Sequence, residues 1–447
     1  GLNAAQREAV TATEGFVRVI AGAGSGKTRV LVERLLSRVE GDGLDVDRFL
    51  VITYTKAAAS ELRGKIAAKL TEEIARQPEN RHLQRQMQRL FLTKISTVHG
   101  FCSDLLREYA YKLYIAADFR VADENECREI RETVLEGLLD RAYETAGDDP
   151  DFRAFVDTQG VGRSDRQVPE IIEKVYDSAH CHLNPEAWLD KCLTDADAEG
   201  IGDVGETVWG QYLIRNLQEY LDCQIAVLQQ CAESADNCPG LERPAVTLRD
   251  AMYQLEQLRA CTIWDDIVAK RELRFGSLRF PTKDNPDPEL TDRIKAAWSA
   301  CKEGLKKKLS GFSNDSGQVL TDLHQTAAAQ RGLVALVRQF DRDYTAAKRS
   351  RRVLDFGDLE HKTLDLLLGK SRSQPTAAAR EIGRRYREIM VDEYQDSNGV
   401  QDAIFEALTR EKQNCFMVGD VKQSIYQFRS ADPGIFLEKY EKYVPAR

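Results

Sequence analysis

The residues from Ala21 to Thr28 have the types and spacing of a phosphate-binding loop. The sequence Ala-Gly-Ala-Gly-Ser-Gly-Lys-Thr follows an apolar run and precedes a helical pattern. A strand that turns sharply into a helix directs successive backbone N–H groups into one concavity, where the positive end of the helix dipole favours a polyphosphate. In such loops the lysine reaches the β- and γ-phosphates and the hydroxyl binds Mg²⁺. The pattern predicts these two roles for Lys27 and Thr28.

The loop departs from the strict pattern at one position, because Ala21 stands where a glycine is expected. Its context fits nonetheless. Apolar residues predict a strand over 16–21, and they recur at helical spacing between Val30 and Val39. A glycine-rich loop that binds nothing would not require strand, loop and helix to coincide. We therefore assign nucleotide contacts to Ala21, Gly22, Ala23, Gly24, Ser25, Gly26, Lys27 and Thr28.

Two acidic residues further along the chain provide what hydrolysis of a bound nucleotide requires. That reaction needs a metal partner and a group that orients and deprotonates the attacking water. Asp392 ends the apolar run Glu388–Val391, where it is placed to hold Mg²⁺ through its water shell, and Glu393 beside it is the natural general base. Two acids can also simply cap a strand, but the phosphate loop upstream favours the catalytic interpretation.

A glutamine followed by aromatic and basic residues comes after the apolar run Cys415–Val418. Gln423 is predicted to sense the γ-phosphate and to link nucleotide state to its neighbours. Tyr426 and Phe428 can stack on bases without regard to sequence, and Arg429 can pair with phosphate, which suits single-stranded nucleic acid. Core packing is the usual role of isolated aromatic residues, but their closeness to Gln423 favours the nucleic-acid role.

Another glutamine precedes the first predicted strand. The segment from Leu2 to Val10 predicts a short amphipathic helix with Gln6 at its middle. A glutamine amide donates and accepts at once, as the N6/N7 edge of an adenine requires. A glutamine in a helix is usually just solvated, and only the phosphate loop close behind it favours the adenine role.

The elements that position these residues repeat a strand, a loop and a helix. Strands are predicted at Phe49–Thr53 and Leu92–Ser96, the first running into a helix from Ala57 to about Leu70. Together with the first strand, these units predict an α/β fold with a parallel, doubly wound sheet. Ligands bind outside the carboxyl ends of such strands. The loops Thr53–Lys56 and Thr97–Phe101 are therefore predicted to share one edge with the phosphate loop.

The pattern changes from about Lys112 to about Arg349. Long helical stretches such as Glu124–Glu144 and Glu206–Ala232 alternate with loops, and there is hardly any strand signal. We interpret this part as a helical domain inserted into the α/β core. Its basic runs at 306–308 and 348–352 are consistent with contacts to a phosphate backbone and equally with a solvated face.

Composition adds weaker constraints. The 447 residues allow two or more domains, and 42% hydrophobic with 30% charged residues is ordinary for a soluble globular protein. No run of about 18 apolar residues and no leader pattern is present, so we expect a cytoplasmic protein without a membrane span. Ten cysteines without a C-x-x-C pair indicate reduced thiols. The net charge of −9 argues against nucleic acid only weakly, because a groove needs just a local basic lining.

The motifs stand in the same order, on similar local patterns, as in the first half of the UvrD/Rep-like superfamily 1 DNA helicases, which this chain resembles. It is most similar to the N-terminal part of AddA-type helicase–nuclease proteins of bacterial AddAB complexes. The resemblance is specific over roughly the first and last hundred residues. The segments that carry it are Gln6, Ala21–Thr28, Thr53–Lys56, Phe119–Asp123, Thr97–Phe101, Leu354–Leu359, Asp392–Asp396, Gly419–Pro433 and Phe436–Tyr440.

The resemblance implies ATP-driven 3′ to 5′ translocation along single-stranded DNA and unwinding of duplex DNA, in double-strand-break repair and recombination. It implies ATP and Mg²⁺ as cofactors and, as partner, an AddB-type nuclease subunit. It also implies a P-loop NTPase (RecA-like) motor domain formed by 1–112 and 350–447, with the helical domain 113–349 inserted. Gln6 then reads adenine, and Arg29 lies beside the nucleotide. The positions that match the family's DNA contacts are Thr53, Tyr54, Lys56, His99, Phe101, Tyr426, Phe428 and Arg429.

The family continues past this glutamine motif into a second motor domain that supplies arginines to the γ-phosphate, and AddA-type proteins also carry a nuclease. We therefore expect this chain to be part of a larger enzyme and to hydrolyse little ATP alone. The alternative is a module that binds nucleotide and DNA without turnover. A small-molecule kinase is disfavoured, because no compact acceptor-binding lid is apparent.

Overall fold

The protein divides into two compact units in the computed structural model, which describes residues 2–12, 17–20, 26–159, 167–198, 200–281, 285–409, 414–420 and 435. Unit 1 comprises Gly1–Glu144, Arg166–Trp188 and Ala335–Arg447, and unit 2 comprises Thr145–Asp165 and Leu189–Val334. The grouping concerns contacts alone, so the functional domains 1–112 with 350–447 and 113–349 stay a prediction.

Unit 1 is built around a parallel sheet with the order β1-β7-β6-β2-β3 among the described residues. Every neighbouring pair of these strands is parallel, which confirms the predicted parallel sheet. The two strands from the end of the chain lie between β1 and β2, so distant parts of the sequence complete one sheet. The strands are β1 (Val17–Ile20), β2 (Phe49–Thr53), β3 (Lys94–Thr97), β6 (Glu388–Val391) and β7 (Cys415–Gly419).

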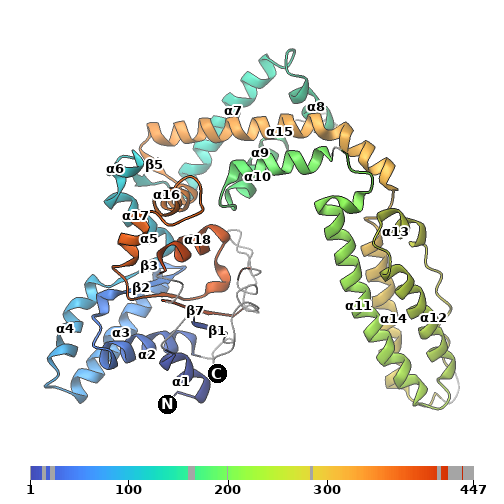
Figure 1. Ribbon diagram of the computed structural model, residues 1–447, viewed down its shortest axis with the longest axis horizontal. Helices are drawn as coiled ribbons and strands as arrows, with labels where there is room; N and C mark the ends of the chain where they lie inside the picture. Colours follow the sequence, from blue (N-terminus) through green and yellow to red (C-terminus); the bar gives the residue numbers. More distant parts are fainter. Residues whose placement is uncertain are drawn as a thin grey trace. The chain divides into compact units, whose positions relative to one another are not determined.

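Both faces of this sheet are covered by helices (Figure 1). Alternate residues of β2 enter different cores, with Leu50 and Ile52 in one and Phe49 and Val51 in the other. Burial on both faces explains why the strands are continuous apolar runs. One face packs on α1 (Ala4–Thr11), α2 (Lys27–Gly41), α3 (Lys56–Arg76) and α4 (Arg81–Arg89). The other packs on α5 (Val98–Glu108), α16 (Phe356–Leu368), α17 (Ala377–Gly383) and α18 (Gly399–Leu408).

The third strand and the segment after it differ from the prediction. The strand was expected at Leu92–Ser96, but Leu90–Leu92 forms the 3-10 helix η2, and the strand begins at Lys94. The expected loop Thr97–Phe101 is instead the strand end and the first turn of α5. The Thr97 hydroxyl accepts the Gly100 N–H at 3.1 Å and caps the helix, which starts one residue later.

The open edge of β3 is covered by a side chain from α3. Arg63 donates to the carbonyls of Leu90 at 2.7 Å, Thr93 at 3.1 Å and Ile95 at 3.3 Å. These carbonyls face outward from the last strand of the described sheet. The guanidinium therefore satisfies acceptors that no further strand pairs with.

The remaining elements of unit 1 include a short parallel pair, β4 with β5. The predicted helix Glu124–Glu144 is confirmed as α7, whereas the two-residue strand β4 lies in a part where hardly any strand was expected. These elements are η1 (Val46–Arg48), α6 (Ala110–Leu113), β4 (Arg120–Val121), α7 (Glu124–Glu144), α9 (Val168–His180), β5 (Val353–Leu354) and η5 (Tyr394–Asp396).

Unit 2 is helical throughout its described part and has a core of its own around Trp264. The helix predicted at Glu206–Ala232 is confirmed as α11, with bounds shifted by a few residues, and it packs beside α12 and α14 (Figure 1). Its elements are α8 (Pro150–Gln159), η4 (Val204–Glu206), α11 (Val208–Asp236), α12 (Glu242–Arg259), α13 (Trp264–Lys270) and α14 (Pro288–Leu309). Two helices, α10 (Pro185–Asp197) and α15 (Ser316–Ser350), have residues in both units. No helix in the described ranges has the length and apolar character that crossing a membrane requires.

A buried ion pair joins the start of unit 1 to its C-terminal strands. Arg34 on α2 donates to Glu388 on β6 at 2.6 Å, and each side chain is 4% exposed. The same guanidinium donates to the carbonyls of Ala9 and Ala12 at 2.9 and 2.6 Å, at the end of α1. The helix that follows the phosphate loop is thus fixed to β6, the strand that leads into the acidic turn.

Removing Glu388 should destabilise unit 1 strongly, because Arg34 would keep a buried charge without its partner. We expect Glu388→Ala to lower the free energy of unfolding by about 3–5 kcal/mol in urea titrations. Glu61→Ala, which breaks the exposed pair with Lys65, is the matched control and should cost less than about 1 kcal/mol. Equal losses in the two variants would contradict this interpretation.

Candidate nucleotide and nucleic-acid site

The predicted phosphate-loop lysine and the predicted general base meet in the structure. Lys27 Nζ donates to Glu393 Oε2 at 2.6 Å, although 366 residues separate them in sequence. Lys27 is the first residue of α2, and Gly26 before it has φ 87°, a left-handed conformation that suits glycine. Glu393 follows β6 directly. The carboxyl ends of β1 and β6 therefore lie at one edge of the sheet.

The acidic turn after β6 has an unusual backbone. Glu393 has φ 51° and ψ 45°, a left-handed conformation that a residue with a side chain rarely adopts. Its N–H donates to Asp392 Oδ1 at 3.1 Å, and its carboxylate Oε2 accepts from Gln395 Nε2 at 2.8 Å. Such strained residues are concentrated at functional sites. The conformation places the carboxylate beside Lys27 while Asp392 stays buried.

Gln395 was missed by sequence reasoning. Its Oε1 accepts the backbone N–H of Asp420 at 2.8 Å, so its amide joins the acidic turn to the residue that follows β7. The only signal for it in the sequence is its position between the acids of Asp392–Asp396. Gln423 and the remaining predicted residues after β7, Tyr426, Phe428 and Arg429, lie outside the described residues, as do Ala21–Ser25.

Asp392 has an electrostatic environment that favours a cation. Its residue is 7% exposed. Burial, with the neighbouring Glu393 carboxylate as the next cause, raises the pKa of Asp392 to about 6. The described residues contain no group of three His, Cys, Asp or Glu suited to a metal. Mg²⁺ at nucleotide sites uses only one or two protein ligands together with phosphates and water, so Thr28 and Asp392 fit it by donor type.

Gln6 has a structural role as well as a suitable position. It lies on α1, where its Oε1 accepts the Asn3 N–H at 2.9 Å and the Asn3 side chain accepts the Gln6 N–H at 2.8 Å. This reciprocal capping box fixes the start of the helix. The Gln6 Nε2 atom stands 3.2 Å from the place where a Cβ on Gly26 would lie. The predicted adenine reader is thus next to the end of the phosphate loop.

The loop after β2 contributes one ring and one exposed cation. The Tyr54 hydroxyl forms a hydrogen bond with Ser397 Oγ, which follows the acidic turn, and burial raises the Tyr54 pKa. Lys56 is exposed at the start of α3. Thr53 is 2% exposed, and its hydroxyl donates to the Thr55 carbonyl at 3.1 Å, so its side chain has a local structural role. Lys56 is therefore the most accessible predicted DNA contact of this loop.

The two predicted DNA contacts on α5 have different surroundings. Phe101 is 1% exposed and packs edge-on against Tyr386 in the core, so the geometry does not support a contact with DNA by its side chain. Its position on the buried face of a helix, rather than in a loop, is the physical reason. The His99 ring is 13% exposed and donates to Glu360 at 2.9 Å. Glu360 was not predicted from the sequence.

Two other sequence assignments also have structural explanations. Arg29 is half-exposed on α2, with Glu33 on the next turn at 3.9 Å. In the basic run 348–352, Lys348 is 2% exposed and pairs with Asp355 and Asp358 at 2.8 and 2.7 Å. A buried lysine with two carboxylates is not placed to follow a phosphate backbone.

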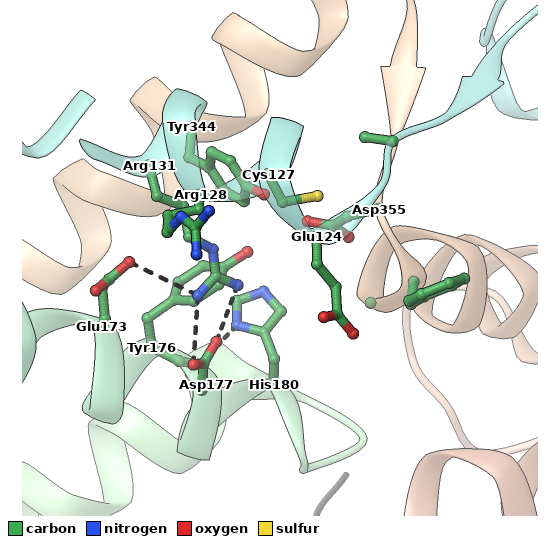
Figure 2. A pocket seen from close by; sticks show the side chains of 13 residues that line it. Glu124, Cys127, Arg128, Arg131, Glu173, Tyr176, Asp177, His180, Tyr344 and Asp355 are labelled. Atoms are coloured by element: carbon green, nitrogen blue, oxygen red, sulfur yellow. Dashed lines mark hydrogen bonds and ion pairs between the residues drawn. The ribbon is translucent and has the colours of Figure 1, made fainter. Parts of the chain in front are cut away.

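A separate cavity of about 480 Å³ in unit 1 contains none of the predicted site residues. Figure 2 shows the Arg131 side chain directed toward Glu173 and Asp177, whose carboxylates lie 3.9 and 3.0 Å away. Its other walls include Tyr176 and His180 from the same helix, α9. Arg131 is therefore already neutralised, and the cavity is not the predicted nucleotide site.

The raised pKa of Asp392 predicts a stability difference that depends on pH. Between about pH 4 and pH 6 the folded protein keeps a proton that the unfolded chain has released, so stability falls as pH rises through this window. Above it the penalty is constant. Asp392→Asn removes the penalty, and it should stabilise the metal-free protein by about 2 kcal/mol at pH 7.5 and by much less near pH 4.5.

Urea titrations in EDTA at both pH values measure this difference. Asp250→Asn, at an exposed aspartate of α12, is the matched control and should change neither value. A destabilised Asp392→Asn variant at pH 7.5 would contradict the electrostatic interpretation.

The chain matches known proteins over nearly its whole length. Residues 2–444 match the family model described as UvrD/REP helicase N-terminal domain. The protein is 38% identical over 99% of its length to an ATP-dependent helicase/nuclease subunit from Pelotomaculum thermopropionicum, and 36% identical over 98% to those from Heliobacterium modesticaldum and Geobacillus thermodenitrificans. It spans 36%, 33% and 36% of these relatives, about a third of their length. The predicted AddA-type resemblance is confirmed, and the chain belongs to the UvrD/REP helicase family.

Proposed function

We propose that the protein is the N-terminal part of an ATP-dependent DNA helicase that moves 3′ to 5′ along single-stranded DNA and acts in double-strand-break repair and recombination. The observation that carries the proposal is the contact of Lys27 with Glu393 at 2.6 Å, at the carboxyl edge of a parallel sheet. It unites the lysine of a glycine-rich loop with an acid that follows a buried aspartate. This combination suits hydrolysis of a nucleoside triphosphate.

In the proposed reaction each residue of the site has one task. Gln6 reads the adenine, and Lys27 binds the β- and γ-phosphates. Because Lys27 holds Glu393, an incoming triphosphate competes for the lysine and releases the carboxylate. Glu393 then orients the attacking water and accepts its proton. Thr28 and Asp392 would hold Mg²⁺, which supplies charge neutralisation at the phosphates when bound.

The fold that we propose for this motor is the P-loop NTPase, RecA-like type. Support comes from the loop that enters α2 with Lys27 and from the five described strands, whose carboxyl ends bear the candidate residues. Arg29 lies on the same first turn. Gln423 is proposed to report the γ-phosphate to the aromatic and basic residues that follow it.

Single-stranded and duplex DNA are the proposed substrates. The candidates among the described residues are Tyr54, Lys56 and His99, which follow β2 and β3 at the edge where the nucleotide binds. The Tyr54 bond to Ser397 supports a link between the sites, because Ser397 directly follows the acidic turn. Tyr426, Phe428 and Arg429 are proposed to stack on bases and bind phosphate.

The complete enzyme is proposed to be larger than this chain, since the relatives are about three times as long. The name of these relatives joins a helicase and a nuclease in one polypeptide. We infer a second motor domain that completes the ATP cleft, a cytoplasmic location and, as partner, an AddB-type nuclease subunit. Little ATP hydrolysis is expected from the chain by itself.

Loss of the general base should abolish turnover and leave nucleotide binding intact. In the full-length protein we expect single-stranded DNA to stimulate the ATPase. Glu393→Gln should lower the stimulated rate at least about 100-fold, because a positioned base contributes that much or more. Fluorescent ATP-analogue binding should change little. Glu79→Gln, at an exposed glutamate before α4, is the matched control.

The same assay separates the two functional hypotheses. Absence of DNA stimulation in the full-length wild type, with nucleotide still bound by this chain, would reject the helicase. The module that binds nucleotide and DNA without turnover would then be the better description.

A further inference from the structure

Glu360 on α16 is a buried carboxylate that collects donors from two other helices. Its Oε1 accepts from His99 Nε2 at 2.9 Å and from Gln401 Nε2 at 2.7 Å, and Asn398 Nδ2 lies 3.4 Å from Oε2. The residue is 7% exposed. Burial alone would raise its pKa, but these donors, His99 first among them, hold the pKa below its ordinary value. The carboxylate is therefore ionised inside the protein.

The donors connect places that the proposed reaction uses separately. His99 is on the first turn of α5, after β3, and is a candidate DNA contact. Asn398 is the N-cap of α18, where its Oδ1 accepts the Gln401 N–H at 2.8 Å. The chain reaches Asn398 directly from the acidic turn Asp392–Asp396 and Ser397. Glu360 thus joins the helix of the DNA candidate to the segment that leaves the ATP site.

The contact also determines how the histidine presents itself. An ionised carboxylate can only accept, so the bonded Nε2 carries the proton and a neutral ring keeps Nδ1 as its acceptor. The opposite constraint comes from Phe356, whose ring centroid lies 4.5 Å from that of His99 at an interplanar angle of 32°. Phe356 is 38% exposed. With the carboxylate and this ring both in contact, the imidazole has little freedom to turn.

We propose that Glu360 is a positioning residue for nucleic-acid binding: its carboxylate holds the His99 imidazole in its binding orientation and ties that ring to the N-terminus of α18, beyond the acidic turn. The inference rests on the proposed function, since it requires His99 to contact DNA. Glu360 touches neither nucleotide nor DNA in this account and acts through His99. A purely structural role would predict a loss of stability without a specific loss of DNA affinity.

The test uses the full-length protein and measures ATPase rate against the concentration of a single-stranded oligothymidylate. Glu360→Gln keeps the shape and removes the charge. We expect the half-saturating DNA concentration to rise on the order of tenfold, as for loss of a charge-assisted hydrogen bond, with a smaller change in the rate at saturating DNA. The control Glu79→Gln should match the wild type in both values.

A double-mutant cycle with His99→Ala distinguishes positioning from general support of the fold. If Glu360 acts through His99, the double variant should have the same half-saturating concentration as His99→Ala alone. Thermal unfolding of each variant reports its stability. Should Glu360→Gln fail to fold, Glu360→Asp keeps the charge but withdraws it by one methylene, and it should raise the half-saturating concentration by a smaller factor.

The outcomes separate the two proposals. A wild type without DNA stimulation rejects the proposed function, and this inference fails with it. With a stimulated wild type, a folded Glu360→Gln variant whose half-saturating concentration equals that of Glu79→Gln rejects the inference alone. Multiplicative effects in the double variant reject it too, because they would show that Glu360 acts independently of His99.

Discussion

The register between β2 and β6 is the constraint on which the candidate site depends. Ile52 pairs with Val391, and the Asp392 N–H continues the ladder to the Ile52 carbonyl at 3.0 Å. Thr53 and Asp392 consequently leave the sheet side by side, although more than three hundred residues separate them. A shift by one residue would turn Asp392 and its neighbours to the opposite faces of the sheet. The buried bond of Arg34 with Glu388, at the other end of β6, holds the strand in this register.

Sequence reasoning was sufficient for the parallel sheet and for the shared edge of Lys27 and Glu393, because apolar runs, glycines and strand-end acids are local signals. It was insufficient where a contact joins residues without a common period. Glu360 lies among the apolar residues of α16, and nothing local indicates that His99 is its partner. Phe101 was assigned to a loop, yet the capping hydroxyl of Thr97 begins the helix earlier and turns that ring into the core. The structure of the glutamine motif lies outside the described residues, so Gln423 stays a prediction.

Charge in this protein is distributed between buried pairs and exposed groups, which explains why net charge is a poor guide to its partners. Lys348 was assigned to a basic run, but its ammonium is neutralised inside by Asp355 and Asp358. Arg131 is likewise held by Asp177 within its cavity. In contrast, Lys56 is exposed at the edge where the candidate residues gather. Local accessibility at that edge, rather than the sum of −9 over the chain, is the relevant quantity for binding a polyanion.

The guanidinium of Arg63 along β3 has a consequence for how this protein behaves in a crowded solution. An uncovered edge strand is a template on which another chain can add its own strand, and such growth leads to aggregates. Arg63 occupies the carbonyls of Thr93 and Ile95, and a positive charge accompanies them. An incoming strand would have to displace that side chain before it could pair. The edge of β3 is therefore protected against sheet-to-sheet association without an additional strand or a proline.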